Sequence, residues 1–213
     1  MFFEKKEELI NYLIRNNVLK TENIINAFLK IDRKDFIRPE NLFEAYADYP
    51  LPIGSGQTIS QPWTVAFMLE LLQPQEGNKI LDVGFGSGWT TALLAQIVGD
   101  KGRVYGIEIL PEIFEFGKNN IEKYNFLKKN IVKLKLGDGS KGWKEYSPFD
   151  RILVSASANE IPPALIEQLN INGMIVIPDK EGINQIFKDN NGNIEKKYYY
   201  GFKFVPLLSQ EYF

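Results

Sequence analysis

Short apolar runs alternate with longer amphipathic segments between residues 79 and 178. A short apolar run bounded by turn residues predicts a buried strand, whereas apolar positions three or four residues apart predict a helix. We expect strands at 80–83, 103–107, 131–136, 149–155 and 174–178, and helices at 89–98, 111–124 and 162–169. This alternation is typical of a parallel sheet with helices on both faces.

The two flanking regions follow other patterns. Residues 4–16 predict a helix, and a second helix begins at Thr21, whose hydroxyl we expect to cap it. Residues 31–53 are rich in proline and aromatic residues and predict an ordered loop on the body of the protein. After residue 178, the segments 183–188 and 195–205 read as strands joined by a turn at 190–193. They predict an antiparallel hairpin at the sheet edge.

The most informative stretch is 79–90, where the first expected strand turns through Gly84, Gly86 and Gly88 into a helix. Glycines permit a tight turn and let a ligand approach the backbone, while the helix N-terminus presents free N–H groups. Glu108 ends the next strand, about 20 residues further on, where a carboxylate can accept hydrogen bonds from a ribose diol. A solvated acid at a strand end is the alternative interpretation of Glu108.

Two classes of nucleotide-binding enzyme fit this turn. A nicotinamide or flavin enzyme is expected to carry G-x-G-x-x-G, whereas Gly84, Gly86 and Gly88 form G-x-G-x-G, which favours an S-adenosylmethionine methyltransferase. Asp82, just before the first glycine, also suits that class. Asp138, in the run Gly137-Asp138-Gly139, could accept a hydrogen bond from an adenine amino group, unless this run is a plain turn.

Composition narrows the possible chemistry. The chain has 213 residues, a net charge of −2, no cysteine and no histidine. The near-neutral charge gives no indication of nucleic-acid binding. The missing residue types exclude thiolate metal sites and the commonest general base. No apolar run reaches the roughly 18 residues that span a bilayer, and the first ten residues do not resemble a secretory signal. We therefore expect a cytoplasmic protein with no membrane partner and no metal.

A polar segment, residues 54–62, precedes the glycine turn. Pro62 suits the first turn of a helix that continues to Leu72. From spacing alone, Ser60 is most simply a residue that caps this helix.

The sequence resembles the protein-L-isoaspartate O-methyltransferase family. The matching segments are AYADYPLPIG at 45–54, GQTISQP at 56–62, the glycine turn, GDG at 137–139 with GW at 142–143, PFD at 148–150 and EIP at 160–162. They follow the family's order from about residue 21 to residue 207. The segments around 50–62 are specific to the family, whereas the glycine turn is shared by most methyltransferases of this class.

The resemblance implies an enzyme that repairs damaged proteins. It would use S-adenosylmethionine to methylate the α-carboxylate of L-isoaspartyl residues, leaving S-adenosylhomocysteine, and the ester would then collapse to a succinimide unaided. Ser60 would lie beside the substrate carboxylate, in a pocket shaped by Gln57, Thr58 and Ile59. The cofactor would be held by residues already singled out: Asp82, Gly84, Gly86, Gly88, Glu108, Asp138 and Gly139.

The residues agree with this chemistry. A carboxylate is a competent nucleophile at neutral pH, so a chain without histidine needs no general base, and the protein's task is positioning and exclusion of water. We expect one Rossmann-like domain, with a mostly parallel seven-stranded sheet, an antiparallel C-terminal hairpin and an N-terminal helical extension. Residues 1–60 would form the substrate-side extension and 61–213 the cofactor-binding core. We also expect a monomer.

Two alternatives stay open. One is a methyltransferase of the same fold that acts on RNA or a small molecule, and the other is a non-catalytic S-adenosylmethionine-binding module. The chain also departs from the family pattern at Asp179-Lys180-Glu181, where a small apolar segment with glycine is usual. This charged segment could reshape the rim where peptide enters.

Overall fold

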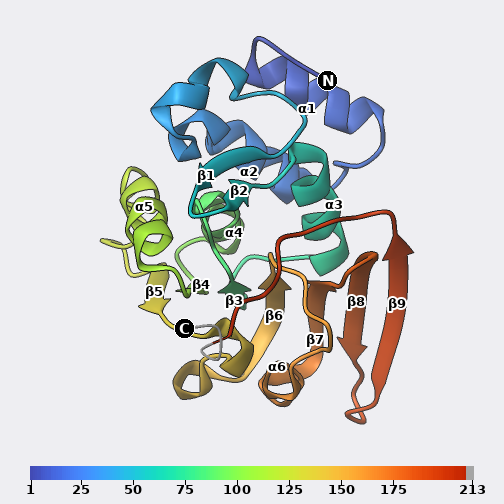
Figure 1. Cartoon of the computed structure of the whole chain (residues 1–213). Coiled ribbons are helices and arrows are strands. Elements are labelled where there is room, and N and C mark those ends of the chain that lie inside the picture. Colours follow the sequence, from blue (N-terminus) through green and yellow to red (C-terminus); the bar gives the residue numbers. More distant parts are fainter. Residues whose placement is uncertain (210–213) are drawn as a thin grey trace.

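A seven-stranded sheet forms the centre of the structure (Figure 1). In this computed structural model, which describes residues 1–209, the strand order is β5-β4-β3-β6-β7-β8-β9. Strands β3 to β7 pair in parallel, whereas β8 and β9 are antiparallel to their neighbours. The strands are β3 (Lys79–Val83), β4 (Arg103–Glu108), β5 (Val132–Leu136), β6 (Phe149–Val154), β7 (Leu169–Pro178), β8 (Gly182–Lys188) and β9 (Ile194–Tyr200). The predicted Rossmann-like fold class is confirmed.

Helices cover both faces of this sheet, because apolar side chains alternate between its two sides. On one side Ile80, Val104 and Leu153 share a buried cluster with the N-terminal and central helices. On the other side Leu81, Tyr105 and other residues of the same strands pack against the last helix. The helices are α1 (Lys6–Arg15), α2 (Glu22–Lys30), α3 (Pro62–Leu72), α4 (Trp89–Val98), α5 (Pro111–Glu122) and α6 (Pro163–Glu167).

The N-terminal extension packs on the helices rather than on the sheet. Helix α2 contacts α3 and α4, and α1 contacts α2, so one side of the sheet carries two layers of helices (Figure 1). The Thr21 hydroxyl does not cap α2 as expected. It donates instead to Glu70 Oε2 of α3 at 2.7 Å, and the same carboxylate accepts from the Lys20 and Thr21 backbone N–H groups. The hydroxyl therefore ties two helices together.

The expected loop at 31–53 contains regular structure. It forms two 3-10 helices, η1 (Arg33–Phe36) and η2 (Pro39–Glu44), and then the strand β1 (Leu51–Gly54). Strand β1 pairs antiparallel with β2 (Gln57–Ile59), so the polar segment before α3 is a short hairpin with its turn at Ser55 and Gly56. These strands are too short, and too interrupted by Pro52, for a period-two pattern to reveal them.

Ser60 does not cap helix α3. The N-cap residue is Gln61, and neither side chain forms the cap. The buried Asp48 carboxylate does so from a distance, since its Oδ1 accepts from the Trp63 N–H at 2.9 Å and its Oδ2 accepts from the Gln61 amide at 3.2 Å. The Ser60 hydroxyl is thereby left for another purpose.

A buried arginine organises the irregular segment before the hairpin. Arg33 is 2% exposed, and its guanidinium donates to the carbonyl oxygens of Ala45 (2.7 Å), Ala47 (3.2 Å), Tyr49 (3.0 Å) and Ser60 (3.2 Å). Burial lowers its pKa to about 9, while the Asp48 carboxylate opposes that change. Arg33 therefore stays protonated at neutral pH and satisfies backbone carbonyls that no strand or helix pairs.

Strand β7 begins earlier, and strand β9 ends earlier, than the sequence predicts. Strand β7 begins at Leu169, which pairs with Phe149 before the register shifts. Strand β9 ends at Tyr200 rather than Val205. The chain then leaves the edge and returns across the top of the sheet to its centre (Figure 1). There Val205 and Leu207 bond to the backbone of Ser157, at 2.8 Å in each case. No helix within residues 1–209 is long and apolar enough to cross a membrane.

We predict that Arg33→Met lowers the free energy of unfolding by about 3 kcal/mol, because it leaves buried carbonyls without donors. Urea denaturation would measure the loss. Arg15→Met, at an exposed arginine in the last turn of α1, is the matched control and should change stability by no more than about 0.5 kcal/mol. An equal, small effect of the two substitutions would contradict the role assigned to Arg33.

Candidate active site

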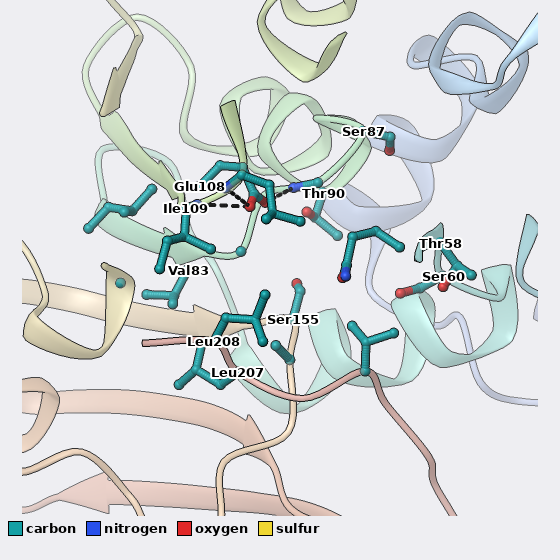
Figure 2. Close-up of a pocket in the computed structure, with 18 of the residues that line it drawn as sticks. Thr58, Ser60, Val83, Ser87, Thr90, Glu108, Ile109, Ser155, Leu207 and Leu208 are labelled. Carbon is teal, nitrogen blue, oxygen red and sulfur yellow. Dashed lines mark hydrogen bonds between the residues drawn. The ribbon is translucent and has the colours of Figure 1, made fainter. Parts of the chain in front are cut away.

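A pocket opens at the carboxyl ends of β3, β4 and β6, where the strand order reverses (Figure 2). Val83 pairs with both Ile107 and Val154, so these three strands end at the same level. Open α/β sheets bind ligands in the crevice at such a point. Eight of the predicted site residues line this pocket, namely Gln57, Thr58, Ile59, Ser60, Gly84, Gly86, Glu108 and Gly139. Asp82, Gly88 and Asp138 are not among the lining residues.

The glycines of the turn have different surroundings. Gly84 and Gly86 lie on the pocket wall with φ of +72° and +55°, and an added Cβ would find its nearest neighbours at 3.9 Å and 3.7 Å. Gly88 packs against α5, where an added Cβ would lie 2.8 Å from the Gly117 carbonyl oxygen. The first two glycines therefore leave space beside the pocket, and the third lets α4 start close to α5.

Glu108 is held by backbone donors around the pocket. Its Oε2 accepts from the Gly86 N–H at 3.1 Å, and its Oε1 accepts from the N–H groups of Ile109 (2.8 Å) and Leu110 (3.0 Å) (Figure 2). Burial raises the pKa of Glu108, and these three donors act in the opposite direction. The result is a fixed carboxylate facing the cavity, with lone pairs that can still accept from a ligand.

Asp82 lies beneath the pocket wall and is fully buried. Its Oδ2 accepts from the hydroxyls of Thr91 (2.6 Å) and Thr90 (3.1 Å), and Thr90 itself lines the pocket. Within residues 1–209, no group hydrogen-bonds the buried Oδ1. Burial raises the pKa of Asp82 to about 6, the two hydroxyls oppose the shift, and the nearby Glu108 charge adds to it.

Asp138 is engaged in its own turn. Its Oδ1 accepts from the Ser140 N–H (2.9 Å) and hydroxyl (2.6 Å), and its Oδ2 lies 3.8 Å from Lys141 Nζ. These bonds fix the 3-10 helix η3 (Gly139–Lys141), whose first residue lines the pocket. The expected adenine contact of Asp138 stays a prediction, and the geometry shows that this carboxylate also shapes the loop.

A second hollow adjoins the first on the side of α3 and β9. The two share Thr58, Ser60, Ser155 and Val205 as lining residues. In Figure 2 the side chains of Ser60 and Ser155 point into the space between their elements. Among residues 1–209, no group hydrogen-bonds the Ser60 hydroxyl, while its carbonyl is fixed by Arg33. The hydroxyl is therefore free to bind a ligand at the junction of two cavities.

Two parts of the wall were absent from the sequence-based prediction. One is Ser155, directly after β6, which the sequence analysis placed only at the end of the expected strand 149–155. The other is residues 205–208, which close the pocket from the side opposite the glycine turn (Figure 2). The expected strand at 195–205 concealed this return, because apolar residues in a short segment do not distinguish a strand from an extended wall. Among residues 1–209, no group of three or more acidic side chains could hold a metal ion.

Comparisons with known proteins agree on one family. The sequence model described as protein-L-isoaspartate(D-aspartate) O-methyltransferase matches residues 4–212. A protein-L-isoaspartate O-methyltransferase of Methanopyrus kandleri is 41% identical over 218 aligned positions, which cover 100% of this chain and 95% of that protein. Another, from Pyrococcus horikoshii, is also 41% identical and covers 98% of this chain and 94% of the relative.

A solved structure is similar throughout. It is a Plasmodium falciparum protein described as a protein-L-isoaspartate O-methyltransferase, in complex with S-adenosyl-L-homocysteine. It has a TM-score of 0.87 and 28% sequence identity, and the match covers 98% of this chain and 100% of that one.

We predict that Asp82 makes stability fall as the pH rises. The pKa of the Asp82 carboxyl is about 6 in the folded state, whereas an exposed aspartate has a pKa of about 3.9. At pH 5 the folded protein therefore keeps a proton on Asp82 that the unfolded protein has released. That contribution is lost as the pH rises through 6. In Asp82→Asn the free energy of unfolding, relative to the unsubstituted protein, should therefore increase by up to about 3 kcal/mol between pH 4 and pH 7.

Urea denaturation at the two pH values would measure this change. Asp100→Asn, at an exposed aspartate after α4, is the control and should show no such pH-dependent difference. An Asp82→Asn protein with the same pH profile as the unsubstituted protein would contradict the prediction.

Proposed function

Because the chain belongs to the protein-L-isoaspartate(D-aspartate) O-methyltransferase family, we propose that it methylates the α-carboxylate of L-isoaspartyl residues in damaged proteins and peptides, using S-adenosylmethionine. The observation that carries this proposal is the pair of adjoining cavities. One has the features of a cofactor site and the other is open to a polymer substrate, and Ser60 lies on the boundary between them.

The residues of the first cavity fit S-adenosylmethionine. The ribose diol offers two donors, and Glu108 is a buried acceptor fixed at the cavity wall. Asp82, with its unpartnered buried Oδ1 within the described residues, gives this region a negative potential that suits a cationic ligand. Gly84 and Gly86 leave space for close approach of the ligand to the backbone. Gly88, Asp138 and Gly139 would support the walls that make these contacts.

When bound, S-adenosylmethionine supplies an activated methyl group. The acceptor carboxylate is ionised at neutral pH, so the chain's own residues need not remove a proton. The Ser60 hydroxyl would donate to one carboxylate oxygen, which fixes the direction of the other. Gln57, Thr58 and Ile59 would form the wall behind the acceptor, and residues 205–208 would exclude water from the reacting centre.

The packing of the N-terminal helices bears on the domain organisation. Within residues 1–209 the N-terminal helices share one buried cluster with the sheet, which supports treating the chain as one domain with a substrate-side extension at 1–60. A monomeric state, a cytoplasmic location and the absence of a nucleic-acid partner stay predictions from the sequence.

Methyl transfer to paired peptides would test the proposal. With radiolabelled S-adenosylmethionine, we expect labelling of a peptide that contains one L-isoaspartate and none of its normal L-aspartyl twin. Base-labile label would identify a methyl ester. Equal labelling of both peptides would contradict the proposal. Labelling of tRNA instead would favour the RNA methyltransferase, and cofactor binding without any acceptor would favour a non-catalytic module.

A crossed pair of substitutions would separate the roles of two site residues. Ser60→Ala should lower kcat for the isoaspartyl peptide at least tenfold, with the Kd for S-adenosylhomocysteine changed no more than about twofold. Glu108→Gln keeps the side-chain length but removes the charge and one acceptor, so that Kd should rise about tenfold or more, with kcat at saturating cofactor nearly unchanged. Calorimetry and steady-state kinetics would provide the values. The reverse pattern would refute both assignments.

A further inference from the structure

We propose that the second hollow is a subsite for an apolar side chain next to the isoaspartate in the substrate, and that it gives the enzyme a preference for aromatic or large aliphatic neighbours. This inference rests on the proposed function, and it adds the chemistry by which the enzyme would select among damaged sites. The hollow lies between α3, β9 and the segment that follows β9.

One wall of the hollow is a continuous set of aromatic rings. Trp63 stacks on Phe67 with ring centroids 5.4 Å apart, and Phe67 stacks on Phe202 at 5.0 Å. Tyr199 meets Phe67 edge-on at 5.4 Å. All four residues line the hollow and come from three separate parts of the chain. The rings therefore form a single apolar surface that further apolar groups can extend.

These rings pack α3 against β9, but part of their surface stays exposed to the hollow. Each of the four is only partly buried, although each packs on another ring. The polar end of Tyr199 is already satisfied, since its hydroxyl donates to Gln185 Oε1 at 3.1 Å. What the wall offers a ligand is therefore mainly ring surface.

The position of the wall defines its occupant. Trp63 is three residues after Ser60, at the start of α3, and the two residues line the same hollow. A peptide that presents its isoaspartyl carboxylate to Ser60 extends by about 3.5 Å per residue. We therefore assign the aromatic wall, which lines the same hollow as Ser60, to the side chain of an adjacent residue rather than to a distant part of the substrate.

The rim of the hollow is charged, but its charges are mixed. Lys180 and Glu181 lie side by side on one edge, in a turn held by Asp179, whose Oδ1 accepts from the N–H groups of Glu181 and Gly182 at 3.0 Å each. Lys203 is also on the rim. Opposite charges next to each other give no strong preference for either sign in a substrate, so the apolar wall is the selective element. A polar rim around an apolar centre is also the usual anatomy of a protein-binding surface.

A series of isoaspartyl peptides would test the subsite. The peptides differ in one residue before or after the isoaspartate, which is Gly, Leu, Phe, Lys or Asp. We expect kcat/KM for the best Phe or Leu peptide to exceed that of its Gly counterpart about tenfold, mainly through KM. A wild-type kcat/KM that is the same for all neighbours, or highest for Lys or Asp, would overturn the proposal.

Substitutions in the aromatic wall would show whether these rings cause the preference for apolar neighbours. Phe202→Ala should reduce the Phe-to-Gly ratio of kcat/KM to about twofold or less. Phe202→Leu, which preserves an apolar side chain, should give an intermediate ratio. Phe43→Ala, at an aromatic residue that is 84% exposed and outside both cavities, is the matched control and should leave the ratio unchanged. An unchanged ratio in folded Phe202→Ala would contradict the assignment.

A binding measurement separates this proposal from the proposed function. Calorimetric titration of the same peptides into enzyme saturated with S-adenosylhomocysteine requires no methyl transfer. We expect the Phe peptide to bind about tenfold more tightly than the Gly peptide. If no peptide is methylated but this difference is present, the proposed reaction fails and the subsite stands. If isoaspartyl peptides are methylated but bind equally well, the reaction stands and the subsite fails.

Discussion

The position of the polar segment 54–62, which carries Ser60, depends on the charged hydrogen bonds of Arg33. Residues 45–49 belong to no strand or helix, and the carbonyl groups of Ala45, Ala47 and Tyr49 all face the buried Arg33 guanidinium. A single guanidinium supplies the missing donors, and it also holds the carbonyl of Ser60 and lies over the Trp89 ring at 5.5 Å. Trp89 begins the helix after the glycine turn. The Arg33 side chain thus fixes the distance between the polar segment 54–62 and the glycine turn, which belong to different parts of the chain.

Buried negative charge is the complementary constraint on the other side of the site. Asp82 and Glu108 lie close enough for the charge of Glu108 to raise the pKa of Asp82, and both residues are buried. Such a pair costs free energy in the empty protein unless donors compensate it. Backbone N–H groups and threonine hydroxyls offset part of this cost here. The remainder favours a ligand that carries positive charge, so some of the cofactor's affinity is stored in the protein before binding.

The central sheet and the glycine turn could be predicted from the sequence because both are local patterns. In the segment 79–98, consecutive residues predict a strand, a turn and a helix. Glu108 follows at the end of the next predicted strand. The hairpin at 51–59 could not be predicted, since its strands are very short and one contains Pro52. Asp48 as the cap of α3 and Arg33 as the donor to four carbonyls depend on contacts across long sequence separations. The return of residues 202–208 was likewise hidden, because its partner at Ser157 is distant in the chain.

Residues 205–208, which form one wall of the pocket, affect the order in which the fold assembles during synthesis. Every strand of the parallel sheet is synthesised before this segment leaves the ribosome, so the sheet can assemble while the cofactor pocket still lacks one side. The pocket is complete only when the segment docks on Ser157. A ligand that binds only the closed pocket stabilises this docked state by mass action. Bound S-adenosylmethionine would then stabilise the docked position of this segment as well as supply the methyl group.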